Sequence, residues 1–419
     1  MRYDVVVIGA GAAGLAAARD LSGAGKRVCL IEARSRVGGR AHTLHLPTLP
    51  VPIELGAEFI HGEPDETFAI VDAAGLLVYR LPDDHWWARD GELQPLRNFW
   101  DQLDGILKRI NKRRDVSFAH FLRSRRNLTE RQREMAINFV EGYHAAHADR
   151  MSALAVAGEA DEEQEAPKQF RLGRGYTGVF DWLRAGLDPE RVDLRLGEAV
   201  RTIRWKEGDV TATTTKETIR AKAAVITIPI GVWKAPRDQE GAIAFEPALP
   251  EKEAAVAKLE IGHVVKIVYH FRERFWRDDQ NFIHTTNRFV PTWWTAAPAR
   301  APILTAWAGG HAADSLLAER SDTRVDRGLD AMSETFDVPR KKLDALLVAA
   351  HGHDWQADPY SRGAYSYAGV GGIGAHDALA KPIRNTLFFA GEATSSEQTG
   401  TVAGALASGK RAARALLRR

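Results

Sequence analysis

Cysteine is nearly absent from this sequence. The 419 residues include one cysteine, Cys29, so no disulfide can form within the chain. This excludes the disulfide-rich scaffolds of small secreted proteins and is compatible with a reducing compartment. Cys29 lies in the apolar run "RVCLI", which predicts a small core side chain rather than a reactive thiol.

Long apolar runs and an excess of one charge are missing as well. No stretch approaches the roughly 18 consecutive apolar residues of a membrane span. The 57 basic and 55 acidic residues nearly balance, which predicts no bulk attraction to nucleic acid or an anionic membrane. The N-terminal "MRYDVVVIGAGAAG" enters a strand at once and lacks the features of a signal peptide. We therefore expect a soluble, cytoplasmic protein without nucleic-acid or membrane partners. The sequence leaves open whether it forms a homo-oligomer.

Two charged segments interrupt this balance. Ten basic and two acidic residues lie between Lys108 and Arg133, and the run "EADEEQE" covers residues 159–165. The charge pattern of the basic segment predicts the solvent-exposed face of two helices. The acidic run fits either a surface loop or an entrance for a cationic substrate.

A glycine-rich turn follows the first predicted strand. Gly9, Gly11 and Gly14 form G-x-G-x-x-G between the strand "YDVVVI" and the helix "AGLAAARDLSGAG". Such glycines allow a tight turn and bring a helix N-terminus close to a pyrophosphate. Glu32 ends the next strand, where a carboxylate accepts hydrogen bonds from ribose hydroxyls. Residues 1 to about 35 therefore predict a βαβ unit that binds a dinucleotide.

A second G-x-G-x-x-G, at Gly369, Gly371 and Gly374, lacks that setting. It follows "SRGAYSY" rather than an apolar strand, and no acidic strand end comes at the right distance. We interpret it as a loop, which leaves a single dinucleotide site.

A lysine stands in the middle of the predicted strand "IGHVVKIVYHF", residues 261–271. By two-residue alternation, Lys266 shares one face with Val264 and Val268. Lysine is rarely buried without a partner, and on an edge strand its side chain reaches water. The strand alone therefore favours an edge strand whose Lys266 faces solvent, and a lysine that faces a site is the alternative.

Six motifs extend the pattern along the chain. They are "EARSRVGGRAHT" (32–43), "ELGAEFIHG" (54–62), "AVITIPIGVW" (224–233), "GHVVKIVYHFRERFW" (262–276), "HDWQADPYSRGAYSY" (353–367) and "LFFAGEATSSEQTGTVAGALASG" (387–409). In the residues of these motifs and in their order along the chain, the sequence resembles the flavin-containing amine oxidase family. This family includes monoamine oxidases, polyamine oxidases and flavin-dependent histone demethylases. The resemblance covers nearly the whole chain.

The resemblance implies FAD as the cofactor. Glu32 would hold the adenosine ribose, Arg40 would lie along the pyrophosphate, and the backbone of Val200 would meet the adenine. Glu392 would approach the pyrophosphate and ribityl chain, and a helix from Thr401 would direct its positive end at the flavin. The other positions implied to bind FAD are Gly9, Gly11, Ala13, Gly14, Ala33, Arg34, Gly38, Gly39, Gly56, Ala57, Glu58, Trp355, Gly391 and Val402.

The covalent tether of animal monoamine oxidases is not expected here. The position of the tethering cysteine falls on Ala364, so the resemblance implies non-covalent FAD. Trp355 matches a tryptophan beside the flavin and fits a buried core residue nearly as well. We expect no metal centre.

Four residues are implied in the chemistry at the flavin. Lys266 matches the lysine beside flavin N5, with a role in flavin reoxidation or imine hydrolysis. Tyr365 matches the first tyrosine of the monoamine oxidase sandwich. The second position falls on Thr401, a departure that is closer to polyamine oxidases and histone demethylases. His61 matches an active-site position of several polyamine oxidases, and it fits a structural histidine equally well.

The implied reaction is hydride transfer from an amine to flavin N5, giving an imine and then an aldehyde, with O2 reduced to H2O2. Trp86, Trp87, Trp293 and Trp294 are candidates for an apolar pocket, and at least half of them are expected in the core. Polyamine and bulky monoamine substrates both stay open. The alternatives are an L-amino acid oxidase, another oxidase or desaturase of the superfamily, and a non-catalytic flavin-binding protein.

The fold class that follows is mixed α/β. We expect a discontinuous Rossmann-like FAD-binding domain over residues 1–80, 172–250 and 352–419. A substrate-binding domain of helices and a mixed or antiparallel sheet is expected to be inserted over residues 81–171 and 251–351.

Overall fold

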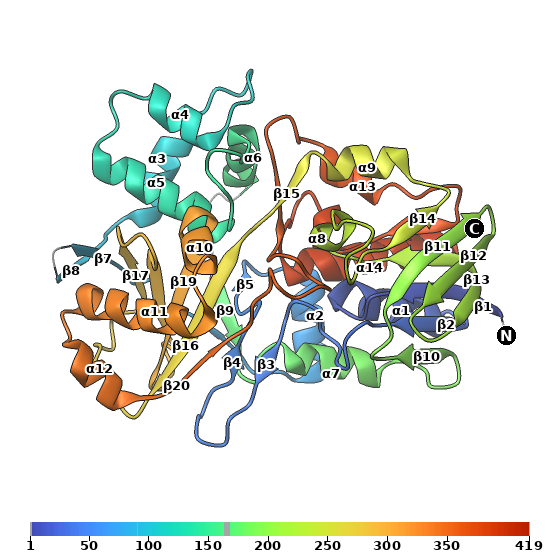
Figure 1. The fold of residues 1–419 in the computed structure, drawn as a ribbon, viewed down its shortest axis with the longest axis horizontal. Coiled ribbons are helices and arrows are strands. Elements are labelled where there is room, and N and C mark those ends of the chain that lie inside the picture. Colours follow the sequence, from blue (N-terminus) through green and yellow to red (C-terminus); the bar gives the residue numbers. More distant parts are fainter. Residues whose placement is uncertain (1, 90, 163–167, 419) are drawn as a thin grey trace.

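The computed structural model describes residues 2–89, 91–162 and 168–418. Two large sheets organise these residues, one near both chain termini and the other beneath a group of short helices (Figure 1). No described helix has the length and apolar character needed to cross a membrane. Residues 163–165 of the acidic run 159–165 lie outside the described residues.

The first sheet contains the dinucleotide motif. Its strands are β1 (Arg2–Ile8), β2 (Val28–Ile31), β10 (Val192–Arg195), β11 (Val200–Lys206), β12 (Asp209–Thr214), β13 (Thr218–Ile226), β14 (Ala244–Glu246) and β22 (Leu387–Phe389). They run in the order β10-β2-β1-β13-β12-β11-β14, with β22 also paired to β13. β10, β2, β1 and β13 pair in parallel, and β11 to β13 form an antiparallel meander. The predicted βαβ unit is confirmed.

Alanine and glycine let two helices pack closely beside this sheet. The helices near it are α1 (Ala12–Gly23), α2 (Asp65–Ala74), α7 (Thr177–Ala185) and α14 (Val402–Leu417). α1 buries an alanine-rich face against the sheet and α14. A Cβ added at Gly409 of α14 would lie 2.2 Å from the carbonyl oxygen of Ala13, so only glycine permits this approach. This packing places the N-termini of α1 and α14 beside the same cavity.

The second sheet is mixed, as expected. Its strands are β7 (His85–Arg89), β8 (Glu92–Pro95), β16 (Val264–Phe271), β17 (Phe282–Thr285), β18 (Thr292–Thr295), β19 (Ile303–Gly309) and β20 (Leu347–Gly352), in the order β20-β16-β19-β18-β17-β7-β8. Only β7 and β17 pair in parallel. β16 lies between β20 and β19, and all eight of its residues are buried. Lys266 therefore does not lie on an edge strand.

Two groups of helices cover the second sheet (Figure 1). One group has its own apolar core and consists of α3 (Phe99–Leu107), α4 (Phe118–Ser124), α5 (Glu130–Tyr143) and α6 (Ala153–Glu162). The other consists of α10 (Gly310–Leu317), α11 (Ser321–Phe336) and α12 (Arg340–Leu346). The hairpin of β7 and β8 precedes the first of these helices, α3.

Short elements connect the two large sheets. The remaining strands are β3 (Thr43–Leu44), β4 (Ile53–Glu54), β5 (Ile60–His61), β6 (Val78–Arg80), β9 (Gln169–Leu172), β15 (Leu259–Ile261) and β21 (Ser366–Ala368). The remaining helices are α8 (Ile230–Trp233), α9 (Pro250–Val256), α13 (Ala375–Ala380) and the 3-10 turn η1 (Glu392–Thr394). The second glycine motif lies between β21 and α13, as the predicted loop. The division into two domains at the boundaries given above remains a proposal.

Candidate active site

One cavity brings the sequence-predicted site residues together. It has a volume of about 1110 Å³ and extends from the glycine-rich turn to aromatic residues of the second sheet. Lys266, Tyr365, His61 and Thr401 all line it. So do the residues implied to bind FAD, with the exception of Gly14: Gly9, Gly11, Ala13, Glu32, Ala33, Arg34, Gly38, Gly39, Arg40, Gly56, Ala57, Glu58, Val200, Trp355, Gly391, Glu392 and Val402.

The three glycines of the turn have different surroundings. Gly9 has a φ of +99°, and a Cβ there would lie 2.5 Å from Thr227 Oγ1. A Cβ on Gly14 would lie 1.8 Å from the carbonyl oxygen of Gly9, so Gly14 allows α1 to pack against the turn and faces away from the cavity. A Cβ on Gly11 would have ordinary contact distance, 3.8 Å, to Gly39 Cα. Gly11 therefore leaves space on the cavity side.

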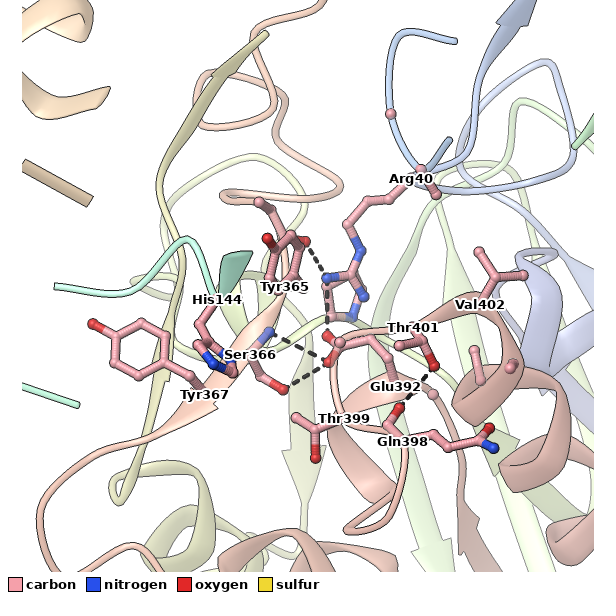
Figure 2. A pocket seen from close by; sticks show the side chains of 18 of the residues that line it. Arg40, His144, Tyr365, Ser366, Tyr367, Glu392, Gln398, Thr399, Thr401 and Val402 are labelled. Carbon is pink, nitrogen blue, oxygen red and sulfur yellow. Dashed lines mark hydrogen bonds and ion pairs between the residues drawn. The ribbon is translucent and has the colours of Figure 1, made fainter. Parts of the chain in front are cut away.

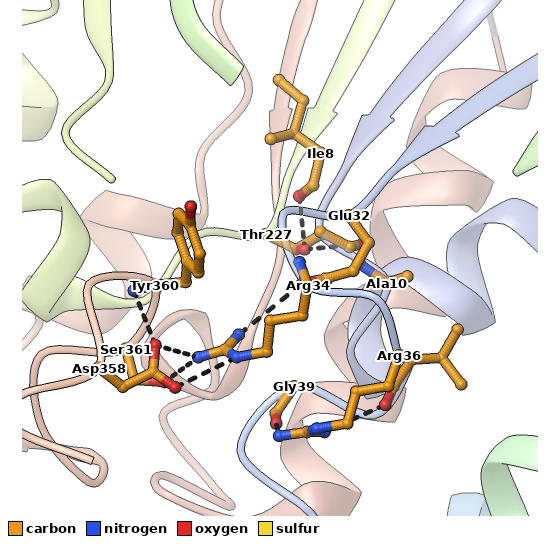
Figure 3. A network of polar contacts seen from close by, with 12 residues as sticks. Ile8, Ala10, Glu32, Arg34, Arg36, Gly39, Thr227, Asp358, Tyr360 and Ser361 are labelled. Atoms are coloured by element: carbon orange, nitrogen blue, oxygen red, sulfur yellow. Dashed lines mark hydrogen bonds and ion pairs between the residues drawn. The ribbon is translucent and has the colours of Figure 1, made fainter. Parts of the chain in front are cut away.

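Glu32 is held at the end of β2 by backbone donors (Figure 3). Its carboxylate accepts hydrogen bonds from the amides of Ala10 at 2.8 Å and Arg34 at 2.9 Å. The side chain of Arg34 donates to both carboxylate oxygens of Asp358, at 2.7 and 3.2 Å, and to Ser361 Oγ at 2.7 Å. Arg34 thus fixes the loop around Asp358 against the dinucleotide turn.

Arg36 is a structural contributor that sequence reasoning missed. Its guanidinium donates to the carbonyl oxygens of Val37, Gly39 and Ala41, which lie in the turn that carries Arg40 (Figure 3). Arginine is common in such glycine-rich segments, so the motif gave no signal that distinguished this role.

Glu392 joins three segments of the cavity wall (Figure 2). It accepts a hydrogen bond from Arg40 Nη1 at 2.9 Å, from Ser366 Oγ at 2.7 Å and from the Ser366 amide at 3.3 Å. Arg40 also donates to the carbonyl oxygen of Ala364. A buried carboxylate needs such partners, and they hold the 38–40 turn beside the 364–366 segment.

The residues present fit FAD. The first turn of α1 has no side-chain cap, so its amide groups remain available to an anion such as a pyrophosphate. Gly11 leaves room on the cavity side, and the same cavity is lined by Glu32, which follows β2, and by Val200, the first residue of β11. Trp355, whose Nε1 donates to the Leu55 carbonyl at 2.9 Å, is fixed in the wall beside Gly56.

Lys266 is paired with a carboxylate. Its Nζ donates to Glu58 Oε2 at 2.7 Å and to the Gly56 carbonyl at 3.1 Å. Glu58 also accepts from Arg171 Nε at 2.8 Å and from Trp294 Nε1 at 3.1 and 3.2 Å. Burial alone would raise the pKa of Glu58, but the charges and hydrogen bonds of Lys266 and Arg171 hold that pKa below its usual value. An ionised Glu58 thus fixes the Lys266 ammonium at the cavity wall.

His61 presents an unpaired nitrogen. Among the described residues, its buried Nδ1 has no hydrogen-bond partner. Its ring packs edge-on against Tyr143, with the ring centroids 5.1 Å apart. Burial lowers the pKa of His61 to about 4, so the imidazole is neutral at physiological pH. It can therefore offer one ring nitrogen to a polar group in the cavity.

Tyr365 and Thr401 lie at the N-terminus of α14. The Tyr365 hydroxyl donates to the Tyr143 carbonyl at 2.6 Å. Thr401 is the N-cap of α14: its Oγ1 accepts from the Gly404 amide at 2.9 Å and donates to the Gln398 carbonyl at 2.9 Å. A Cβ at Gly400 would lie 2.9 Å from the Tyr365 ring, so this glycine lets the ring approach the N-cap residue Thr401.

Two of the four candidate tryptophans line the cavity. Trp87 and Trp294 do, whereas Trp86 and Trp293 belong to the core beneath the sheet. Sequence reasoning missed the other aromatic lining residues: Phe59, Phe99, Trp100, Phe139, Tyr143, Tyr176, Phe180, Phe282, Trp307, Tyr360 and Tyr367. The sequence offered a clue for Phe139 and Tyr143, because their spacing of four residues places both rings on one face of helix α5.

A pair of histidines adds polar atoms to this aromatic wall. His85 Nδ1 lies 2.8 Å from His284 Nε2, and His85 Nε2 lies 3.0 Å from Asp83 Oδ1. Burial, and to a lesser extent the charge of His85, lowers the pKa of His284 well below its usual value. The His284 imidazole is therefore neutral, and the wall around it remains largely apolar.

Comparisons with known proteins agree with this geometry. The model of a family described as flavin containing amine oxidoreductase matches residues 12–417. Polyamine oxidase 2 of Arabidopsis thaliana is 32% identical over 458 residues, covering 98% of this chain and 87% of that protein. Polyamine oxidase 3 of Oryza sativa subsp. japonica is 30% identical over 447 residues, with 98% and 88% covered. The match to lysine-specific histone demethylase 1 homolog 3 of Arabidopsis thaliana, 29% identical, covers 98% of this chain and 29% of that protein.

Two solved structures share the fold. Cyclohexylamine oxidase from Brevibacterium oxydans IH-35A superposes with a TM-score of 0.82 at 23% identity, and both chains are fully covered. Wild-type putrescine oxidase bound to putrescine gives a TM-score of 0.82 at 21% identity, again with full coverage of both chains. At these identities the likeness shows the fold alone.

Proposed function

Because this chain belongs to the family of flavin-containing amine oxidoreductases, we propose that it oxidises a small-molecule amine by means of non-covalently bound FAD. The substrate is a primary or secondary amine, the product is an imine that water hydrolyses to an aldehyde, and O2 is reduced to H2O2. The proposal extends to a cytoplasmic location, which the single cysteine supports.

The observation that carries this proposal is the continuity of the cavity. The same space is lined by Gly9 and Glu32 of the dinucleotide motif, by Lys266, and by the aromatic residues of the second sheet. The chemistry that FAD supplies when bound is hydride acceptance at flavin N5. A carbon–hydrogen donor must then lie between the dinucleotide side and the aromatic wall.

The chain's own residues orient the amine and exclude water. The aromatic rings form an apolar wall, which favours a neutral amine over its ammonium form because a charge loses its hydration there. The neutral imidazole of His61 supplies a polar partner for the amine nitrogen. Glu58 holds the Lys266 ammonium at a fixed position at the cavity wall.

An amino acid substrate is disfavoured by the arginines of the cavity. Among the described lining residues these are Arg34 and Arg40, on the dinucleotide side. Each already pairs with a carboxylate, Arg34 with Asp358 and Arg40 with Glu392. A substrate carboxylate in the aromatic part of the cavity would therefore meet no arginine.

The test is the visible spectrum of the purified, flavin-loaded protein under anaerobic conditions. Benzylamine, phenethylamine, tyramine, putrescine, spermidine, spermine and several L-amino acids would be added separately. We expect at least one amine to bleach the flavin band and no amino acid to do so, and admission of air should restore the band with formation of H2O2.

Each of the other possible results of this spectral test would contradict part of the proposal. Bleaching by amino acids alone would make the chain an L-amino acid oxidase. A spectrum that responds to none of the compounds would favour a desaturase or a non-catalytic flavin protein. Bleaching without recovery in air would rule out O2 as the acceptor.

A further inference from the structure

A cluster of histidines and carboxylates lies outside the cavity. His147 follows α5, His263 precedes β16, and Asp314 is on α10. His147 Nε2 lies 2.7 Å from Asp314 Oδ2, and His263 Nδ1 lies 2.6 Å from Asp314 Oδ1. One ligand atom from each of the three residues lies within 4.8 Å of the others. Among the described residues that line the cavity, none of these three appears.

Close backbone packing fixes these residues in place. A Cβ at Gly309, just before α10, would lie 1.8 Å from the Glu141 carbonyl oxygen. A Cβ at Gly310 would lie 2.5 Å from the Ala146 carbonyl oxygen, and one at Gly262 would lie 2.8 Å from Ala145 Cβ. The three glycines therefore let the segment around Ala145 contact both the start of β16 and the start of α10. The cluster is held by main-chain contacts and not only by the hydrogen bonds between its side chains.

The donor set suits a particular class of ion. Two imidazole nitrogens and one carboxylate are the ligands of Zn²⁺ sites that leave a fourth position to water. In a tetrahedral site, ligand distances of about 2.0–2.2 Å place donor atoms about 3.3 Å apart. The two imidazole nitrogens contact different oxygens of Asp314, at 2.7 and 2.6 Å, so the side chains must separate slightly to admit an ion. Asp314 and His263 are partly exposed, which leaves them room to move.

A supporting contact orients the buried histidine. The side chain of His147 is 3% exposed, and its Nδ1 lies 3.4 Å from the Tyr367 hydroxyl. A metal-bound histidine typically places its other ring nitrogen against such a partner, which fixes the ring and its tautomer. Tyr367 therefore directs Nε2 of His147 towards Asp314 and His263.

We propose that His147, His263 and Asp314 bind one divalent cation of the Zn²⁺ class. The site joins the segment after α5, the start of β16 and helix α10. His263 lies three residues before Lys266, directly before β16, and the adjacent Gly262 exchanges main-chain hydrogen bonds with Ala364 and Tyr365. A bound cation would therefore stabilise the segments that support the lysine and the tyrosine of the cavity.

His311 provides a matched control on the same helix. Its ring lies 4.9 Å from that of His147, but its Nδ1 pairs with Glu141 at 2.6 Å and its Nε2 lies 3.4 Å from Asp149. Both of its nitrogens are thus directed at other carboxylates, and it stands outside the donor set.

The experiment measures zinc binding by the flavin-loaded protein. The protein is stripped with a chelator, titrated with ZnSO4 against a competing zinc indicator, and analysed for metal after desalting. We expect one zinc per chain in the wild type. His263→Asn and Asp314→Asn should each weaken zinc binding by at least about 10–100-fold, because replacing even a residue that only hydrogen-bonds to a metal ligand lowers metal affinity by that factor. His311→Asn should bind as the wild type does.

A second readout keeps the test independent of activity. Zinc should raise the Tm of the wild type and of His311→Asn and should leave the Tm of Asp314→Asn unchanged, because only a bound ion stabilises the folded state. Absence of zinc from the desalted wild type would overturn the site. Equal losses in His311→Asn and His263→Asn would overturn the assignment of the ligands, since they indicate a diffuse surface cluster.

Discussion

At the scale of single residues, Glu58 determines the position and charge of its neighbours. It accepts hydrogen bonds from Lys266, Arg171 and Trp294, which come from β16, β9 and β18. Arg171 also donates to the Thr295 and Ala297 carbonyl oxygens, at 3.0 and 2.9 Å. Removing Glu58 would therefore leave Arg171 with two acceptors but Lys266 with the Gly56 carbonyl alone.

We predict that Glu58→Gln costs more stability than Lys266→Met. Breaking a buried ion pair and leaving a charge uncompensated costs about 3–5 kcal/mol. Lys266→Met leaves Glu58 with Arg171 and Trp294, so its loss should be smaller. Urea unfolding followed by circular dichroism measures both. If Lys266→Met proves the more destabilising change, Glu58 does not compensate the lysine as described.

At the scale of elements, two glycines of the glycine-rich turn have different roles: one lets helix α1 pack against the turn, and the other leaves room for the cofactor. Gly14 is closed in by the Gly9 carbonyl, whereas Gly11 has extended backbone, with φ −75° and ψ −171°, and open space beside it. The two glycines belong to one motif, yet only one of them is required by the fold of the chain itself.

We predict different defects for Gly14→Ala and Gly11→Ala. The Cβ of Gly14→Ala meets the Gly9 carbonyl at 1.8 Å, so the turn or α1 must shift, and the Tm of the protein should fall markedly even without flavin. Gly11→Ala should keep the Tm of the flavin-free protein and retain less FAD after desalting, because its methyl group occupies the pyrophosphate approach. Equal FAD retention by Gly11→Ala and the wild type would remove Gly11 from the cofactor site.

At the scale of the whole molecule, buried histidines make the stability depend on pH. The pKa of His61 is lowered to about 4 by burial, against an ordinary value of 6.5 in the unfolded chain. Above pH 6.5 neither state takes up the proton. As the pH falls from 6.5 towards 4, the unfolded chain binds a proton that the folded protein does not, so stability is lost.

Glu54 acts in the opposite direction. Burial raises its pKa to about 7 from an ordinary value of 4.5. The folded protein therefore holds a proton that the unfolded chain releases, and this contribution to stability is lost as the pH rises from 4.5 through 7. The two groups partly offset each other in the wild type, so variants are needed to separate them.

We predict that His61→Gln reduces the acid sensitivity of the flavin-loaded protein. Between pH 6.5 and 5, the Tm of this variant should fall by roughly 2–4 °C less than that of the wild type. His45→Gln, which changes an exposed histidine, should match the wild type. Differential scanning calorimetry measures all three proteins. Parallel curves for the wild type and His61→Gln would contradict a neutral, buried His61.

Local patterns in the sequence determined the family and the dinucleotide unit. Gly9, Gly11, Gly14 and Glu32 lie within 24 residues, and local backbone supplies the hydrogen bonds to Glu32 and the carbonyl that Gly14 packs against. The alternating pattern of the first strand and the helical pattern that follows it likewise predicted the βαβ unit, because side-chain periodicity follows directly from backbone geometry. The motif around Lys266 identified the lysine without indicating its partner.

Tertiary structure alone decided the pairings. Lys266 and Glu58 are 208 positions apart in the chain, and His147 and Asp314 are 167 apart. Which of the tryptophans line the cavity also depended on which face of each strand meets the helical group, as Trp293 and Trp294 show. A sequence pattern fixes the direction of a side chain relative to its own strand. The charge, ring or carbonyl that it meets is set by the packing of distant segments, which no local spacing encodes.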